Sequence, residues 1–146
     1  MAQFRFRLEQ VLDFRNRLEE QAMQALAEAV MARDNLVERI RALQEEQARQ
    51  QERMFHADTL DAAERWLLQN YLDALRVDLE TARKHLALAE EEVDRCRVEL
   101  VEKSQERSLL DKLKEKQAAK HAALERQREQ REFDETATLR FKPASF

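Results

Sequence analysis

The stretch LQNYLDALRVDLETARKHLALAEEEVDRCRVEL, residues 68–100, decides the fold of this chain. Within it, mostly apolar residues recur at alternating intervals of four and three: Leu68, Leu72, Leu75, Leu79, Ala82, Leu86, Ala89, Val93, Cys96 and Leu100. This heptad spacing is typical of a helix that buries one seam against another helix. The same positions after Leu100 are mostly charged: Lys103, Arg107, Leu110 and Lys114. The predicted seam therefore becomes polar toward the C-terminus.

A second heptad pattern precedes this stretch. It runs through Phe4, Leu8, Val11, Arg15, Leu18, Ala22, Ala25, Ala29, Ala32 and Leu36, and it is flanked by Leu12, Leu26, Val30, Val37 and Ile40. Between the two patterns lie Asp58, Thr59 and Asp61, which are residue types that cap helix N-termini, and Asp61 has capping-box spacing to Glu64. We therefore predict a single domain over residues 1–146, with a helix over about 4–55, a turn over about 56–60, a second helix over about 61–137 and a tail over 138–146.

The predicted fold class is all-α, a long antiparallel two-helix coiled-coil hairpin. The alternative is one unbroken helix, which would extend about 200 Å at 1.5 Å per residue and would need a partner chain along its length. The change of pattern and the capping residues favour the hairpin. A turn near residue 59 would place Ala22, Ala25, Ala29 and Ala32 opposite Cys96, Val93, Ala89 and Leu86. Phe4 would then reach only to about residue 114, and residues 115–135 would overhang without a facing helix.

The composition agrees with long helices and argues against several kinds of function. The 146 residues include no Gly, one Pro and one Cys, and 38% of them are charged. A chain without Gly lacks the glycine-rich loops that cradle phosphates. Its net charge of −4 is unfavourable for binding nucleic acid. No apolar run approaches the ~20 residues of a membrane span, and a single Cys cannot form an internal disulfide. We expect a soluble cytoplasmic protein.

No constellation of residues predicts catalysis, a metal or a cofactor. His56, His85 and His121 lie well apart in the predicted hairpin, and the sequence contains no HExxH motif or Cys/His cluster. Cys96 occupies a seam position, which predicts a small buried thiol rather than a nucleophile. A two-helix hairpin also offers no concave pocket that could desolvate a substrate. We expect a protein that is not an enzyme and that has no catalytic, cofactor-binding or metal-binding residues.

Aromatic residues just after the predicted turn are candidates for binding a partner. Trp66 and Tyr71 follow the turn, and aromatic anchors are enriched at protein-binding hot spots. The alternative is that these two residues cap the tip of the hairpin together with Phe55. The sequence alone leaves both interpretations open.

The open end of the hairpin carries a second group of candidates. Phe4 lies on the predicted seam, Phe6 and Phe14 lie off it, and Phe133 has no intramolecular partner in the predicted register. Residues 103–146 carry 11 basic and 8 acidic residues, whereas residues 61–102 carry 6 basic and 11 acidic ones. This gradient indicates either an ordinary solvated coiled-coil surface or a basic end suited to an acidic protein partner.

Three segments resemble the flagellar export protein FliJ family: FRLEQVLDFRNRLEEQA at residues 6–22, NYLDALRVDLETARKHL at residues 70–86, and VELVEKSQERSLLDKLKEKQAAKHAALERQREQREFDETA at residues 98–137. The arrangement KSQERSLLDKLKEK…REQREFDE is the most specific of these, and the resemblance covers essentially the whole chain. It implies a component of the bacterial flagellar type III export apparatus, a coiled coil similar to the gamma-subunit stalk of rotary ATPases. Injectisome counterparts share this architecture, and a generic coiled-coil scaffold or tether is the competing class.

The resemblance also implies partners and site residues. Members of the family bind the hexameric flagellar export ATPase through the terminal end of the hairpin, contact the FlhA export gate and recycle export chaperones. On that basis Phe4, Phe6 and Phe133 are expected at the ATPase end. Tyr71 and Leu75 match positions on the family's gate-binding face. The implied location is the cytoplasmic side of the cell membrane, where the protein associates peripherally with the export apparatus.

Overall fold

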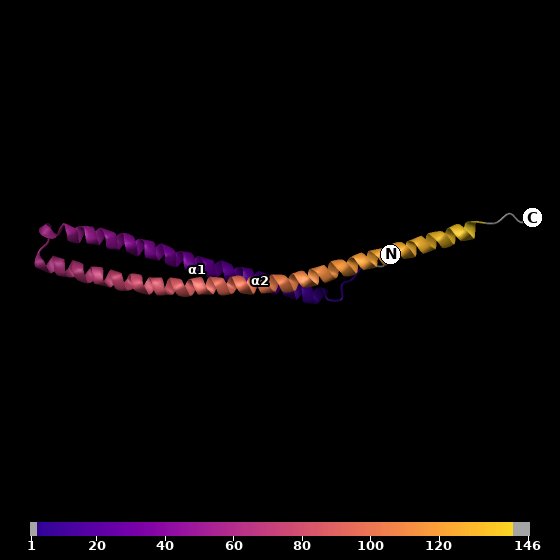
Figure 1. Cartoon of the computed structure of the whole chain (residues 1–146), viewed down its shortest axis with the longest axis horizontal. Helices are drawn as coiled ribbons and strands as arrows, with labels where there is room; N and C mark the ends of the chain where they lie inside the picture. The colour runs from indigo at the N-terminus through magenta and orange to yellow at the C-terminus, as the bar shows by residue number, and fades with distance from the viewer. Residues whose placement is uncertain (1–2, 142–146) are drawn as a thin grey trace, which may run out of the picture. The chain divides into compact units, whose positions relative to one another are not determined.

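The structure, a computed structural model, describes residues 3–141. It contains α1 (Glu9–Phe55), a short 3-10 turn η1 (Ala57–Thr59) and α2 (Ala62–Arg140), and no strand occurs in this range (Figure 1). The predicted all-α helical hairpin is confirmed. α2 continues to Arg140, so the first part of the predicted tail is helical, while residues 142–146 lie outside the described residues.

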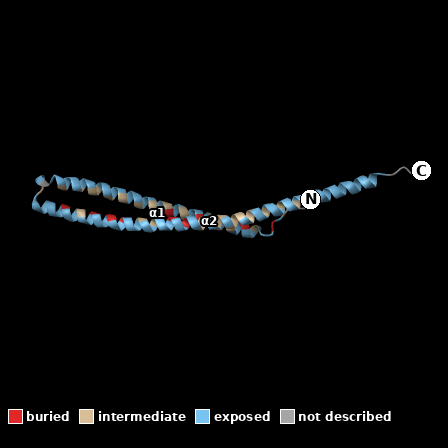
Figure 2. Ribbon diagram, viewed as in Figure 1, coloured by how far each residue is buried: buried red, intermediate tan, exposed pale blue. Residues whose placement is uncertain are grey.

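The chain divides into two compact units, and each contains part of both helices. Unit 1 comprises residues 1–19 and 102–146, and unit 2 comprises residues 20–101. In unit 2 the two helices lie side by side and are joined by the turn (Figure 1). Figure 2 shows that buried residues occur along both helices, and those of unit 2 include Ala29, Val93 and Cys96, which form one packed cluster.

The start of α2 follows from a local cap. The carboxylate of Asp61 accepts a hydrogen bond from the backbone N–H of Glu64 at 2.7 Å. This bond satisfies one of the N–H groups that the first turn of a helix leaves without a partner. In the turn before it, the carbonyl of His56 accepts hydrogen bonds from the N–H and the hydroxyl of Thr59. The cap predicted at Asp61 therefore defines the boundary between the turn and α2.

The seam predicted for α2 is where the helix is buried. All ten seam positions from Leu68 to Leu100 are buried or half-buried, with Val93 only 1% exposed. Neighbouring apolar residues that do not fit the spacing, such as Leu88 and Val98, are exposed. The heptad pattern of this segment therefore predicted its buried face correctly.

The seam predicted for the first helix agrees with the structure over most of its length. Seven of the ten predicted positions are buried or half-buried: Phe4, Arg15, Leu18, Ala22, Ala25, Ala29 and Leu36. Leu8, Val11 and Ala32, which were also predicted on the seam, are exposed. At two of these the adjacent residue is buried or half-buried instead, Leu12 beside Val11 and Arg33 beside Ala32. A strict 3.5-residue repeat differs from an α-helix by about 20° per heptad, which accounts for shifts of one residue.

The register also differs from the prediction away from the turn. Ala29 was expected opposite Ala89, but it shares a packed cluster with Val93 and Cys96, about one helical turn further along α2. Ala32 was expected opposite Leu86, but the adjacent Arg33 lines a groove with Val93 and its neighbours. The predicted register assumed that both helices advance equally along one axis. Ala25, which was predicted opposite Val93, packs against the same cluster, so the difference amounts to about one seam position.

Candidate partner-docking surfaces

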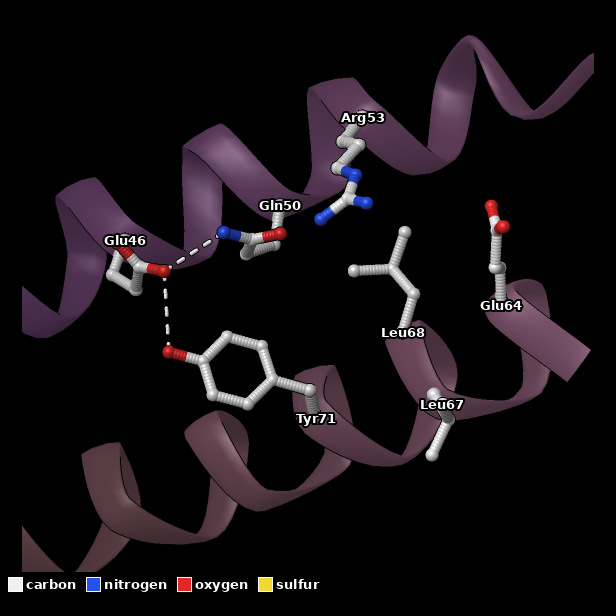
Figure 3. A pocket seen from close by; sticks show the side chains of 7 residues that line it. All are labelled: Glu46, Gln50, Arg53, Glu64, Leu67, Leu68 and Tyr71. Carbon is white, nitrogen blue, oxygen red and sulfur yellow. Dashed lines mark hydrogen bonds between the residues drawn. The ribbon is translucent and has the colours of Figure 1, made fainter. Parts of the chain in front are cut away.

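At the turn end of unit 2, residues of both helices line an open groove. Its walls are formed by Glu46, Gln50 and Arg53 of α1 and by Glu64, Leu67, Leu68 and Tyr71 of α2 (Figure 3). The α1 wall is polar and the α2 wall is largely apolar. The groove has only these two walls, so it can receive side chains of a partner without enclosing a small molecule.

Tyr71 is held in this groove by the carboxylate of Glu46. Its hydroxyl donates a hydrogen bond to Glu46 Oε1 at 3.1 Å, and the side-chain amide of Gln50 donates to the same oxygen at 2.8 Å (Figure 3). Arg49 pairs with the carboxylate as well, and the hydrogen bond from Arg49 is the main reason why the pKa of Glu46 is lowered. The bond to Glu46 in turn raises the pKa of Tyr71, so the phenol stays neutral. Tyr71 therefore presents an oriented ring that is 44% exposed.

Leu75, the second residue expected to contact the gate, does not lie at the surface. Its side chain is only 4% exposed, because it occupies the seam one turn beyond Tyr71. A partner that binds the folded hairpin can contact Tyr71 directly, whereas Leu75 supports the helix pair from within. The heptad pattern had already placed Leu75 on the seam, and a part for it in binding a partner stays a prediction.

The aromatic residues at the turn remain accessible. Phe55 is 86% exposed and Trp66 is 65% exposed. Among the described residues, the ring of Phe55 contacts only the ring of His56, edge to face with centroids 5.6 Å apart. The alternative in which Phe55, Trp66 and Tyr71 form a closed cap over the tip is therefore not what the structure contains. Trp66 remains available to a partner.

In unit 1, the N-terminal residues pack against α2 in a way that the heptad pattern did not predict. Helix α1 begins at Glu9 rather than near Phe4, and residues 3–8 are not helical. In an extended segment alternate side chains share one side. Phe4 is half-buried and Phe6 only 7% exposed, while Arg5 and Arg7 are exposed. Phe6 was predicted to lie off the seam, and the structure buries it.

The same segment reaches further along α2 than expected. The ring of Phe4 lies 5.6 Å from the ring of His121, centroid to centroid, although the predicted register ended near residue 114. An extended chain covers about 3.3 Å per residue, more than twice the rise of a helix, so a few residues reach much further along α2. The overhang predicted over residues 115–135 therefore begins later. Glu125 is half-buried, and residues 126–141 are all exposed.

Phe133 lies within this exposed part of α2. Its side chain is 77% exposed and lines one face of the helix together with Glu129, Glu132, Thr136 and Arg140. The structure thus separates the three residues expected at the ATPase end. Phe4 and Phe6 hold the N-terminal segment on α2, and Phe133 is free to contact another molecule.

Charged pairs join the two helices of unit 1 where the seam is polar. Arg15 donates to Glu106 at 2.7 Å, Lys114 lies 2.8 Å from Glu9, and Arg107 pairs with Glu19. The hydrogen bond to Glu9 is the main cause that raises the pKa of Lys114. The sequence indicates the polar positions but not these pairs. Opposite charges at facing positions could have revealed them, had the register been known.

Other features of residues 3–141 do not add a site. Cys96 is 3% exposed, and burial raises the pKa of its thiol, as expected for a structural cysteine. In residues 3–141 no group of His, Cys, Asp and Glu side chains is arranged to hold a metal ion. No helix in that range is long and apolar enough to cross a membrane.

Comparisons with known proteins identify what the chain is similar to. The family model described as flagellar FliJ protein matches residues 4–144. Among solved structures, the chain is similar to CT670 from Chlamydia trachomatis, described as a YscO homolog, with a TM-score of 0.63 and 20% sequence identity over 94% of both chains. At this identity the likeness concerns the fold alone. No curated protein matches the chain.

Proposed function

Because this chain belongs to the FliJ family of flagellar proteins, we propose that it is a non-enzymatic stalk of the bacterial flagellar type III export apparatus. In this role it binds the hexameric export ATPase, contacts the FlhA export gate and assists the recycling of export chaperones on the cytoplasmic side of the membrane. The observation that carries the proposal is the family match over residues 4–144, nearly the whole chain.

The exposed end of α2 is the part of the chain best suited to the ATPase. Beyond Glu125 every described residue of α2 is exposed, and Phe133 is the large aromatic side chain in the middle of this segment. Such a helix is marginally stable alone and gains order by packing against another protein. In this proposal Phe133 contacts the ATPase directly. Phe4 and Phe6 act through the packing of unit 1.

The groove at the turn end is the proposed contact with the export gate. The ring of Tyr71 is oriented by Glu46 before any partner arrives, so binding costs little side-chain entropy. The neighbouring Leu67 is 61% exposed and adds apolar area to the same site. Leu75 contributes indirectly, because it is buried in the seam one helical turn from Tyr71.

A stalk of this kind performs no chemistry. It can change the ATPase only by binding some states of the ring more tightly than others, which shifts the populations of those states. A generic scaffold or tether, the competing class, would leave the turnover of the ATPase unchanged. An injectisome-type stalk would share the fold, and the likeness to CT670 is compatible with it.

The test uses purified full-length protein, the export ATPase and the cytoplasmic domain of the gate. Phe133→Ala should weaken ATPase binding by about tenfold or more, as expected for an aromatic hot spot, and leave gate binding unchanged. Tyr71→Ala should do the reverse. Val77→Ala, on the same helix and 55% exposed, is the matched control and should affect neither partner.

Circular dichroism must show that all three variants retain their helices. Leu75→Ala is unsuitable here, since loss of a buried Leu costs about 2–5 kcal/mol and would confuse folding with binding. If Phe133→Ala and Tyr71→Ala weaken both partners equally, the two-surface proposal is wrong. If the wild-type protein does not alter ATPase turnover, the scaffold replaces the stalk.

A further inference from the structure

One face of α2 in unit 1 combines lysine and leucine side chains and is not covered by α1. We call it the lysine–leucine stripe, and it consists of Leu109, Lys112, Leu113, Lys116 and Lys120. Leu109 is 68% exposed, and all three lysines are exposed. Most of these residues line a shallow groove along the helix, together with Glu115 and Ala119.

Helical spacing explains why the stripe points away from the seam. Leu109 and Leu113 are four residues apart, as are Lys112, Lys116 and Lys120, so all five residues lie on one side of the helix. The residues that contact α1 are on another side: Glu106 pairs with Arg15, Arg107 with Glu19, and Lys114 with Glu9. Leu113, which is 36% exposed, lies at the edge of the stripe nearest to α1, and Leu109 and the three lysines are exposed.

The charge of the stripe is not neutralised within the described chain. Lys103 and Lys114, which lie outside it, each pair with a glutamate. Among residues 3–141, none of Lys112, Lys116 and Lys120 has an ion pair or a hydrogen bond. The groove contains one carboxylate, Glu115, against two of these lysines. Such a face attracts a ligand with negative charge.

We propose that the lysine–leucine stripe docks an acidic amphipathic helix of a partner protein. The stripe spans about three helical turns, roughly 17 Å from Leu109 to Lys120. A partner helix with apolar residues at intervals of three and four can pack against Leu109 and Leu113. Its carboxylates, one turn apart, then lie beside the lysines, whose spacing is also one turn.

An anionic membrane surface fits the stripe less well. A helix that lies on a membrane buries a continuous apolar face about 5–10 Å deep and keeps its cations at the edges of that face. Here Lys112 and Lys116 lie between and beside the two leucines, so insertion of the leucines would pull ammonium groups toward the acyl chains. A protein helix can place a carboxylate next to each of them. The interleaving of Lys and Leu therefore favours a protein partner.

This inference does not depend on the proposed function. The stripe contains neither Phe133 nor Tyr71, and binding to it can be measured without the export ATPase or the gate. A failure of the experiment below would leave the proposed stalk role untouched. Loss of the stalk role would equally leave the stripe as a binding face of the folded hairpin.

The probe is a fluorescent helical peptide about three turns long, with leucines on one face and glutamates beside them. A control peptide has the same composition in scrambled order, so that its leucines do not share a face. Binding to the full chain is measured by fluorescence anisotropy. We expect the scrambled peptide to bind about tenfold more weakly, because it cannot pair charge and apolar contact together.

Two triple variants with the same change of charge distinguish the stripe from general attraction. Lys112→Gln with Lys116→Gln and Lys120→Gln should weaken the patterned peptide about tenfold. The control, Arg39→Gln with Arg83→Gln and Lys84→Gln, removes three exposed cations of unit 2 and should leave binding within about twofold. Leu109→Ala should also weaken the patterned peptide, since the leucine provides apolar contact.

Several outcomes would overturn the proposal. Equal weakening by both triple variants, or equal binding of both peptides, would show attraction by net charge alone. Vesicles made of equal parts phosphatidylcholine and phosphatidylglycerol supply the lipid comparison. If the stripe variant loses vesicle binding while the patterned peptide does not bind the wild-type chain, the stripe is a lipid-binding face and the proposed helix partner is wrong.

Discussion

Replacing Val93 by Ala tests whether the hairpin is held together at the cluster that joins its two helices. Val93 is 1% exposed and packs with Ala29 and Cys96 in unit 2. A matched control lies on the same helix and in the same unit. Val98 is 60% exposed, so the same substitution there removes the same atoms without leaving a cavity.

The expected effect follows from three contributions. Removing two buried methyl groups costs about 1.6 kcal/mol in lost burial, and the cavity left behind adds about 1 kcal/mol. Ala has a higher helix propensity than Val, which offsets about 0.5 kcal/mol of the lost stability. The net loss for Val93→Ala is therefore about 2 kcal/mol. Val98→Ala keeps only the propensity gain and should be neutral or slightly stabilising.

Urea and thermal unfolding, followed by circular dichroism, measure this difference. For a chain of this length a loss of 2 kcal/mol lowers Tm by roughly 6 °C. The control should stay within about 2 °C of the wild-type value. Equal shifts for the two variants would refute the reasoning, because they would mean that position 93 is no more buried than position 98 and that α1 does not pack there.

Four further predictions concern register, order and pH. Ala25→Cys should form a disulfide with Cys96 within one chain, because both belong to the same packed cluster; crosslinks found only between chains would contradict the hairpin. Amides of residues 126–140 should exchange rapidly in the free protein and slowly with the export ATPase bound, and slow exchange in the free monomer would show that this segment is already packed. The pKa of Glu46 is lowered from its ordinary 4.5. The contribution of the Glu46 carboxylate to stability is therefore complete above pH 4.5 and is lost as the pH falls through the lowered pKa. The NMR signals of the Tyr71 ring should shift in that lower pH range, and constant signals would rule out the hydrogen bond between Tyr71 and Glu46. The pKa of Lys114 is raised above 10.5, so its ion pair with Glu9 should persist at pH 10.5 and below. As the pH rises further the pair should be lost and unit 1 should loosen, which faster amide exchange near Glu9 would report.

Much of the fold was predictable from local patterns. Apolar residues recur along α2 from Leu68 to Leu100 at one strict spacing, and mostly polar residues separate them, so the spacing indicated which face of that helix is buried. Asp61 predicted where α2 begins, because a carboxylate at that position satisfies backbone N–H groups that no other local group can reach. The exposure of Phe133 also followed from the lack of a facing segment.

The docking surfaces depended on contacts between residues far apart in the sequence. Tyr71 was singled out from its place after the turn, but its orientation comes from Glu46 on the other helix. The burial of Leu75 was implied by its place on the seam and is confirmed. The lysine–leucine stripe was not noticed in the sequence, because nothing local distinguishes unpaired lysines from those that pair across the hairpin.

The sequence by itself determined that this chain forms long helices, that α2 has one buried face and that the chain reverses near residue 59. These features follow from the absence of Gly, the heptad spacing and a capping carboxylate, all of which act within a few residues. Tertiary packing alone decided which of two adjacent residues on α1 is buried, as with Val11 and Leu12, and where Phe6 lies. An α-helix drifts from a strict 3.5-residue repeat by about 20° per heptad, so the repeat alone does not distinguish neighbouring positions. Residues 3–6 have no helical periodicity, so only contact with α2 fixes where this segment lies.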